Sequence, residues 1–256
     1  MGKVLALANQ KGGVGKTTAA IELSSLAAAQ KEGSRVLVID LDSQCNATAV
    51  LLGRRDFPAE ESSFALLRKE KLSSRHLHPT SKKELFVIPG SIDLIEAESF
   101  LLGSLDGFFR LQESLSPLKK EFSLIFLDCP PSLSVVTINA LVSSDFLLIP
   151  LQVSKFSLEG LTAMKDTVAT VQKRYNPQLK IAGAFLTMYD SRTNLAQAMV
   201  PEIRQYIPLF KTGIPRSVLI EEAHLLKQDI FSYAPKSKVA EAFRQLFVEV
   251  MDAIQG

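Results

Sequence analysis

Short apolar runs alternate along the chain with segments of helical periodicity. Six runs predict strands buried on both faces of a sheet, at residues 3–8, 35–40, 85–89, 123–128, 145–151 and 180–190. Helical patterns lie between them, at residues 17–30, 92–102, 134–143 and 157–174. This alternation predicts an α/β fold: a doubly wound, mostly parallel sheet flanked by helices, with ligands at the carboxyl ends of the strands.

One stretch, residues 54–83, interrupts this pattern. It is charged and serine-rich, it contains Pro58 and Pro79, and it shows no clear periodicity. We interpret it as a surface excursion with one short helix, because the strand pattern resumes after it and no apolar segment beyond it could form a second core. Residues 1–256 are therefore expected to form a single domain.

Composition narrows the class of protein. Hydrophobic residues make up 46% of the 256 and charged residues 22%, which is typical of a globular domain. The net charge of +2 is not that of a dedicated nucleic-acid binder, so any contact with a polyanion needs a local basic patch. No apolar run reaches the length of about 18 residues that a membrane span needs. Cys45 and Cys129 lack a C-x-x-C partner, which favours a reducing cytoplasm over a disulfide or zinc framework.

The candidate chemistry begins in the loop NQKGGVGKTT, between the first strand and the first helix. Its end fits the phosphate-loop pattern G-x-x-x-x-G-K-[ST], although Gln10 stands where the first glycine is usual. Three glycines allow backbone N–H groups to approach phosphate oxygens, at Gly12, Gly13 and Gly15. Lys16 is placed to contact the β- and γ-phosphates, and the Thr17 hydroxyl to bind Mg²⁺. The loop therefore predicts a P-loop NTPase fold that binds a nucleoside triphosphate with Mg²⁺.

Carboxylates follow two of the predicted strands. Asp128 ends the strand at 123–128, where a carboxylate can hold the metal ion. Asp40 and Asp42 follow the strand at 35–40, and their two-residue spacing projects both to the same side. A carboxylate here could position the attacking water or bind the metal. Asp40 is the stronger candidate, while for Asp42 a structural role stays equally open.

These segments together resemble the deviant Walker A family of ATPases, and within it the ParA (Soj-type) partition proteins. The resemblance covers nearly the whole chain. It lies in the loop NQKGGVGKTT and in VLVIDLDSQCNAT, LIFLDCPPSL, LTMYDSRTNL, IPRS and YAPKSKVAEAF. The loop alone identifies only the superfamily, whereas its combination with the later arginine-bearing segments is specific to the partition branch.

The resemblance implies roles for individual residues. Lys11, the second lysine of the loop, is expected to reach the ATP of a partner subunit, so that two ATP molecules are sandwiched in a homodimer. Gly12 is expected at the crowded dimer contact, and Asp40 is expected to support hydrolysis. The implied catalytic residues are Lys11, Lys16 and Asp40, and the implied metal site is Thr17, Asp40 and Asp128. The implied ATP contacts are Lys11, Gly12, Gly13, Val14, Gly15, Lys16, Thr17, Thr18 and Pro215.

The resemblance also implies partners. The ATP dimer is expected to bind double-stranded DNA without sequence preference, and a ParB-type centromere-binding protein to stimulate hydrolysis, so that a chromosome or plasmid is partitioned on the nucleoid in the cytoplasm. The candidate DNA contacts are Arg192, expected at the start of a helix, with Arg216, Lys227, Lys236 and Lys238. Lys211 is a further basic neighbour.

Two segments depart from the family pattern. Where family members often read IPRNVRLSEAPS, this chain reads IPRSVLIEEAHL, so that Leu219 replaces a second DNA-contact arginine and Glu221 and Glu222 follow it. In VLVIDLDSQCNAT, Ser43 and Cys45 replace the usual proline and glycine.

Other functions within the superfamily remain as alternatives. A MinD-like division-site ATPase binds membranes through a C-terminal amphipathic helix, but the predicted helix at 239–255 carries net negative charge and is expected to pack on its own domain, with no stable membrane association. An iron–sulfur role like that of the nitrogenase iron protein lacks its cysteine context. A small-molecule ligase such as dethiobiotin synthetase shares only the loop. His76 and His78 are interpreted as solvated loop residues.

Overall fold

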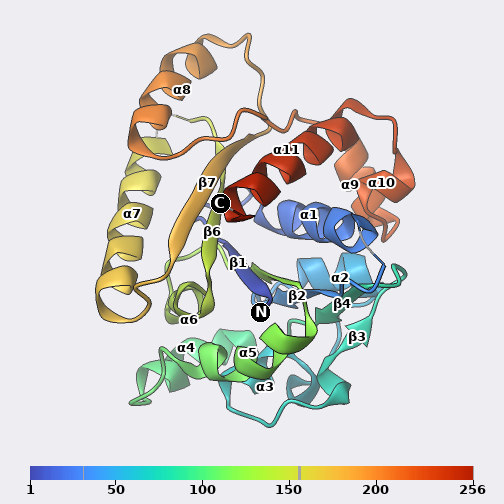
Figure 1. Ribbon diagram of the computed structural model, residues 1–256, viewed down its shortest axis with the longest axis vertical. Coiled ribbons are helices and arrows are strands. Elements are labelled where there is room, and N and C mark those ends of the chain that lie inside the picture. Colours follow the sequence, from blue (N-terminus) through green and yellow to red (C-terminus); the bar gives the residue numbers. More distant parts are fainter. Residues whose placement is uncertain (31, 155–156, 256) are drawn as a thin grey trace.

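A seven-stranded sheet forms the centre of the molecule, in the order β3-β4-β2-β5-β1-β6-β7 (Figure 1). The computed structural model describes residues 1–30, 32–154 and 157–255. The strands are β1 (Lys3–Leu7), β2 (Val36–Asp40), β3 (His78–Pro79), β4 (Leu85–Ile88), β5 (Leu124–Asp128), β6 (Phe146–Gln152) and β7 (Lys180–Thr187). All neighbouring strands pair in parallel except β3 and β4, which are antiparallel. The predicted mostly parallel, doubly wound α/β sheet is confirmed.

Helices cover both faces of the sheet, because successive strand residues point to opposite sides. In β1, Val4 and Ala6 belong to one hydrophobic core, and Leu5 and Leu7 to the other. The first core is covered by α3 (Ser63–Leu67), α4 (Leu94–Leu102), α5 (Arg110–Glu121), α6 (Val135–Ser143), α7 (Ser157–Arg174) and α8 (Asn194–Tyr206). The second is covered by α1 (Lys16–Gln30), α2 (Asn46–Leu52), α9 (Val218–Leu225), α10 (Ile230–Tyr233) and α11 (Lys238–Gln255).

The predicted elements are present, with ends that differ by up to three residues. The largest difference is at β7, which ends at Thr187 rather than at residue 190. The helix expected to start at Arg192 begins at Asn194, with the Thr193 side chain as its N-cap, so that Arg192 lies just before the helix. Four helices were not predicted, namely α2, α5, α9 and α10.

The predicted surface excursion at residues 54–83 is wrong for its central part. Helix α3 is buried along its whole length, and Phe64, Leu66 and Leu67 belong to the first core. Only short elements surround it, the 3₁₀ turns η1 (Ala59–Glu61) and η2 (Ser74–His76) and the strand β3. His76, expected to be solvated, is fully buried. The apolar run FALL was sufficient to fill a gap in the core beside α4 and α5 despite its polar surroundings.

Both edges of the sheet are closed. At one edge, β3 is only two residues long and contains Pro79, which has no N–H to offer another strand. At the other edge, the segment 208–214 runs alongside β7: Ala184 N donates to Pro208 O, and Phe210 N donates to Ala184 O at 2.8 Å. Ile214 N donates to Leu186 O farther along the same strand.

Candidate nucleotide-binding site

The glycine loop lies at the carboxyl edge of the sheet, between the end of β1 and the start of α1. Gly13 and Gly15 adopt positive φ values of 71° and 86°, a conformation that favours glycine. Asn9 fixes the entry to the loop, because its side chain donates to Pro150 O at 2.8 Å and accepts from Lys11 N at 3.0 Å. On the far side, the Thr187 hydroxyl donates to Val14 O at 2.9 Å. The loop is therefore held from β6 and β7 in a shape that only its glycines allow.

Lys16 begins α1 and turns back under the loop. Its side chain is buried, and Nζ donates to the Lys11 carbonyl oxygen at 3.3 Å. Burial lowers the pKa of Lys16, which nearby Asp128 opposes. Among the described residues no carboxylate lies within ion-pair distance of this ammonium, so its charge is available to an anion at the N-terminus of α1.

Asp128 is fully buried at the end of β5, and neither of its carboxylate oxygens has a hydrogen-bond partner among the described residues. Burial raises the pKa of Asp128 well above its usual range, and the neighbouring Asp40 carboxylate adds to this effect. An unpartnered buried carboxylate is costly unless a cation joins it. With the Thr17 hydroxyl nearby, these oxygens fit a bound Mg²⁺, whose preferred ligands are oxygen atoms.

Asp40 lies beside Asp128 on the neighbouring strand β2, but its carboxylate is already occupied. Oδ2 accepts from Thr48 N at 2.9 Å and from the Thr48 hydroxyl at 2.6 Å, and Oδ1 accepts from Asp42 N at 3.1 Å. The side chain is completely buried, and burial raises the pKa of Asp40 to about 6 although Thr48 opposes the shift. This geometry does not fit the predicted role in positioning water or binding metal; Asp40 instead ties β2 to α2.

Asp42 lies two residues beyond Asp40, past the end of the strand, and is partly exposed. Its Oδ1 accepts from Gln44 N at 2.9 Å, which leaves the other oxygen without a partner in the described chain. Asp42 is also close enough to Lys16 to raise the pKa of that lysine. Of the two carboxylates that follow β2, Asp42 is thus the one that faces the phosphate end of α1.

The remaining predicted ATP contacts surround the loop. Gly12 and Lys11 are exposed on its outer side, and the Lys11 ammonium has no partner among the described residues. A Cβ at Gly12 would meet only Pro131 at 3.8 Å, so a small side chain is tolerated within one subunit. Thr18 follows Thr17 in the first turn of α1, and Pro215 is half-buried beyond the end of β7.

Arg192, the first of the predicted DNA contacts, is exposed but paired. Its guanidinium donates to both oxygens of Asp190, from Nε at 2.9 Å and from Nη2 at 2.8 Å. The guanidinium also lowers the pKa of Asp190 to about 2. The side chain of Arg192 is 88% exposed, so this pair is accessible to solvent and to salt.

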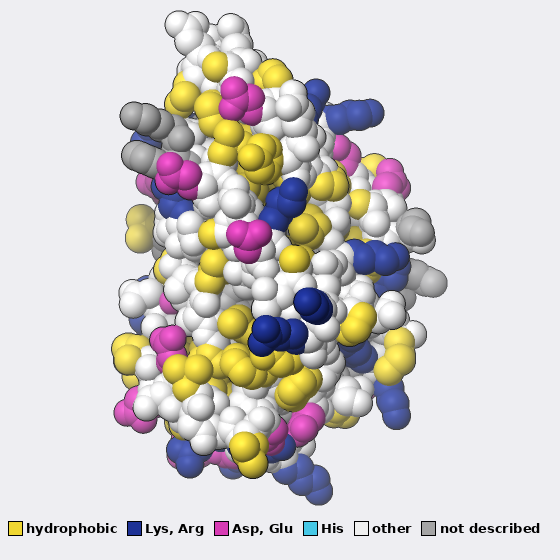
Figure 2. Space-filling model, turned by 90° about the vertical axis from the view of Figure 1, so that its left-hand side faces the viewer, with side chains coloured by type: hydrophobic (Ala, Val, Ile, Leu, Met, Phe, Trp, Pro, Cys, Tyr) yellow, Lys and Arg dark blue, Asp and Glu magenta, His cyan; other side chains and the backbone are white. Residues whose placement is uncertain are grey.

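The other predicted DNA contacts are also at the surface. Arg216, Lys236 and Lys238 are exposed, while Lys227 borders a cavity beside α1. On the face that bears α7 and α8, basic and acidic side chains are scattered among hydrophobic patches (Figure 2). The described residues on this face form no continuous basic surface of the kind that follows a DNA backbone.

Three site residues were missed or undervalued by sequence reasoning: Asn9, Asp42 and Thr48. Asn9 and Thr48 act on the site through hydrogen bonds to the loop and to Asp40. Their partners are separated from them by many residues or by a turn, so no periodic pattern marks them. The signal for Asp42 was present, since it lies two positions past the end of β2.

The buried lysine, the glycine loop and the unpartnered carboxylate define a P-loop nucleotide-binding protein, and comparison with known proteins narrows this class. A family model described as an AAA domain matches residues 2–181. The chromosome partitioning protein ParA of Myxococcus xanthus is 41% identical over 254 residues, which cover 98% of this chain and 88% of that protein. The chromosome-partitioning ATPase Soj of Thermus thermophilus is 40% identical over 253 residues, covering 98% and 96%.

A solved structure with a different printed function shares the fold. A Mycobacterium smegmatis protein described as cobyrinic acid a,c-diamide synthase, with bound ADP and magnesium, superposes with a TM-score of 0.82 and 31% identity. The match covers 100% of this chain and 96% of that one. The chain belongs to the ParA/Soj family of partition ATPases, as its sequence motifs predicted.

Proposed function

We propose that this ATPase binds ATP with Mg²⁺, forms an ATP-sandwich homodimer, and in that state binds double-stranded DNA without sequence preference. A ParB-type partner then stimulates hydrolysis and releases the dimer, which moves a chromosome or plasmid over the nucleoid in the cytoplasm. The observation that carries the proposal is the pair of loop lysines. Lys16 is turned into its own phosphate site, whereas Lys11 points outward with no acidic partner in the described chain.

The exposed position of Lys11 supports a role in trans. A cation supplied by a second subunit stabilises the charge of a transferring phosphoryl group, and comparable arginine fingers accelerate hydrolysis by roughly 10³–10⁵. Two such loops would repel each other without bound phosphates between them, so association depends on ATP. The exposed Gly12, which leaves room at the same surface, is consistent with close approach of a partner.

Co-sedimentation tests this function. The protein is mixed with nonspecific duplex DNA, or separately with anionic liposomes, in MgATP and in MgADP. We expect it to pellet with DNA only in MgATP and less at higher salt. Pelleting with liposomes in MgATP would assign the protein to a membrane-positioning function. If the protein pellets with neither DNA nor liposomes, the proposed DNA binding is wrong.

The contacts of the last helix favour DNA over membrane. Most apolar residues of α11 are buried in the second core, namely Val239, Ala240, Phe243, Leu246, Phe247, Val250 and Ile254. The expectation that this helix packs on its own domain is confirmed, and its apolar face is occupied. No helix in the described ranges is both long and apolar enough to cross a bilayer.

We propose that Asp42, rather than Asp40, positions the water that attacks ATP. Asp42→Ala is expected to lower hydrolysis by about 10²–10⁴, the usual contribution of a general base, and to leave ATP bound in a long-lived dimer. Asp40→Ala is expected to unfold more easily, because each donor left without an acceptor costs about 1–3 kcal/mol. Phosphate release, size-exclusion chromatography in MgATP and thermal melting separate the two. An Asp42→Ala protein with normal turnover would return the role to Asp40.

Arg192 is proposed to contact DNA only after it leaves Asp190. Asp190→Asn is therefore expected to raise duplex affinity several-fold in MgATP, because it frees the guanidinium and removes a negative charge. Arg192→Ala should lower the affinity and reduce the slope of log affinity against log salt by about one per protomer. Fluorescence anisotropy across a salt series measures both. Equal affinity in Asp190→Asn and wild type would mean that the ion pair does not restrain Arg192.

A further inference from the structure

A basic cavity of about 630 Å³ opens beside the first turn of α1, and Lys11 is not among the residues that line it. Its walls come from α1, α2, the segment after α2 and the end of α9. The polar residues that line it include Thr17, Thr18, Arg54, Arg55, His224 and Lys227. One acid, Asp56, lies among them. Three permanently charged cations therefore line the cavity, together with only one carboxylate.

These cations are not neutralised by an acidic partner among the described residues. Arg54, Arg55 and Lys227 form no ion pair among the described residues, although eleven such pairs occur elsewhere in them. Arg54 is instead held over the ring of Phe57, with its guanidinium carbon 4.1 Å from the ring centroid. This stacking fixes the side chain and leaves its N–H groups free to donate.

Lys227 is also held in place rather than left to move. Its backbone has φ of 60°, a left-handed conformation that costs a non-glycine residue about 1–3 kcal/mol. Its ammonium donates to the Gly53 carbonyl oxygen across the cavity rim, which leaves two of its three N–H groups unused. The strained backbone and this bond together place a charge where α9 meets the end of α2.

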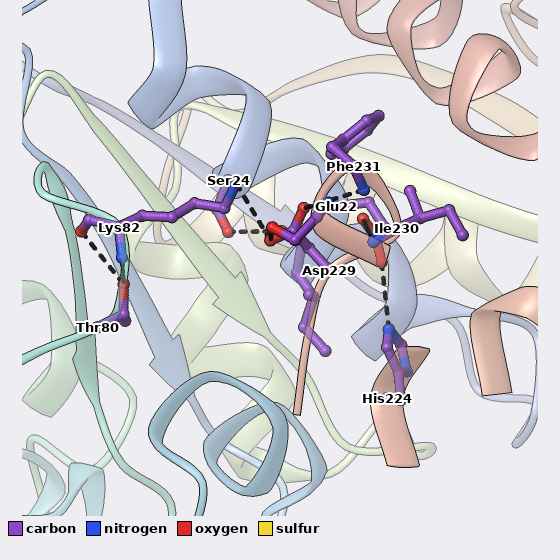
Figure 3. Close-up of polar contacts among 10 residues, drawn as sticks. Glu22, Ser24, Thr80, Lys82, His224, Asp229, Ile230 and Phe231 are labelled. Carbon is purple, nitrogen blue, oxygen red and sulfur yellow. Dashed lines mark hydrogen bonds and ion pairs between the residues drawn. The ribbon is translucent and has the colours of Figure 1, made fainter. Parts of the chain in front are cut away.

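The α9 wall is anchored to the nucleotide-binding helix through Glu22 (Figure 3). Glu22 lies one turn beyond Thr18 on α1 and is completely buried. One oxygen of its carboxylate is 3.2 Å from Nε2 of His224, and the other accepts from Ile230 N at 3.0 Å. A buried carboxylate needs such partners, so breaking either contact is costly.

A second anchor lies at the start of α10. Asp229 caps this helix by accepting from Phe231 N and Ser232 N, each at 3.0 Å, and it pairs with Lys82 at 3.1 Å (Figure 3). Lys82 belongs to the loop between β3 and β4. The segment that carries His224 and Lys227 is thus fixed at both ends, so the cavity keeps its shape without a ligand.

We propose that this cavity binds phosphate groups of the DNA backbone, through Arg54, Arg55 and Lys227. The inference rests on the proposed function and adds a second surface through which the protein would contact DNA. It also accounts for Leu219, which packs toward the second core where the family carries an arginine. The positive charge that is missing at the start of α9 is supplied by Lys227, which follows the end of this helix. Contacts of this kind carry no sequence information, as nonspecific binding requires.

The test compares two double variants that remove the same charge. Arg54→Ala with Arg55→Ala changes the cavity, and Lys71→Ala with Lys120→Ala changes two exposed lysines elsewhere. Duplex affinity is measured by fluorescence anisotropy across a salt series in MgATP and in MgADP. ATP affinity is measured separately with a fluorescent ATP analogue.

We expect the cavity variant to lose about tenfold in duplex affinity for each contact at ~0.1 M salt, with the salt slope reduced by about two per protomer, while ATP affinity stays unchanged. The control should match wild type. Duplex binding equal to wild type would overturn the cavity proposal alone. A parallel fall in ATP affinity would overturn it too, by assigning the cavity to the nucleotide. Wild-type protein that binds no duplex in MgATP would overturn the proposed function itself.

Discussion

Asp128→Asn is expected to abolish ATP hydrolysis and yet to raise the melting temperature of the nucleotide-free protein at neutral and alkaline pH. The carboxylate of Asp128 is buried, and neither of its oxygens is hydrogen-bonded in the described chain. This arrangement favours binding of Mg²⁺ and destabilises the folded protein when the ion is absent. Asparagine removes the charge at nearly the same volume. We expect the rate to fall by at least about 10²-fold, as for loss of one preorganised electrostatic group.

The pH dependence gives this prediction its sign. Because the pKa of Asp128 is raised in the folded protein, the folded state binds a proton more tightly than the unfolded state. The stability linked to that proton is present below the ordinary carboxyl pKa and is lost as the pH rises through the folded value. Asp40, with its pKa raised to about 6, adds a loss of stability of the same sign.

Thermal melts in EDTA at about pH 5 and about pH 8 measure this effect. The advantage of Asp128→Asn over wild type should grow with pH, each kcal/mol corresponding to about 2–4 °C for a chain of this size. Asp252→Asn, an exposed change in α11, is the matched control. MgATP should reverse the order, because it stabilises only a protein that binds it. A variant less stable than wild type at the higher pH would contradict the electrostatic explanation.

The two loop lysines are expected to fail in different ways. Lys16→Ala should lower ATP affinity by at least about 100-fold, because a buried ammonium aimed at the phosphates is lost from a site of low dielectric constant. Lys11→Ala should bind ATP as wild type does. It should stay monomeric in MgATP, and its hydrolysis should lose the acceleration of roughly 10³–10⁵ that a cation in trans supplies.

Fluorescent nucleotide titration and light scattering after size exclusion separate these outcomes. An Asp42→Ala background slows turnover, so that the ATP state persists during the run. Lys71→Ala serves as the control for loss of an exposed lysine. If Lys11→Ala dimerises in MgATP like its parent, the second lysine is not the link between subunits. If it loses ATP affinity, it acts within its own site.

Most of the fold could be predicted from the sequence, because buried parallel strands are short continuous apolar runs, and few other structures produce this pattern. Helix α5 was missed although Leu111, Leu115 and Leu118 follow helical spacing, since Pro117 and a polar composition obscured it. The burial of α3 could not be predicted, because four apolar residues gain a place in the core only from elements distant in sequence.

The candidate site was predicted less evenly. The loop could be assigned because glycines, lysine and threonine are adjacent in sequence and act through the backbone. The choice between Asp40 and Asp42 could not be made, because it depends on Thr48, which reaches Asp40 only after α2 has folded back. Likewise, the pairing of Arg192 with Asp190 and the grouping of Arg54 with Lys227 depend on side-chain directions that spacing does not specify.

The closed edges of the sheet limit how copies of this protein can assemble. With Pro79 at one border and the segment 208–214 along the other, none of the strands that the structure describes offers a free edge to a strand from a second copy. Folded copies of the protein therefore have no route to a cross-β fibre through these strand edges. Association between folded copies must instead use side-chain surfaces, which can separate again more readily than a continuous backbone ladder.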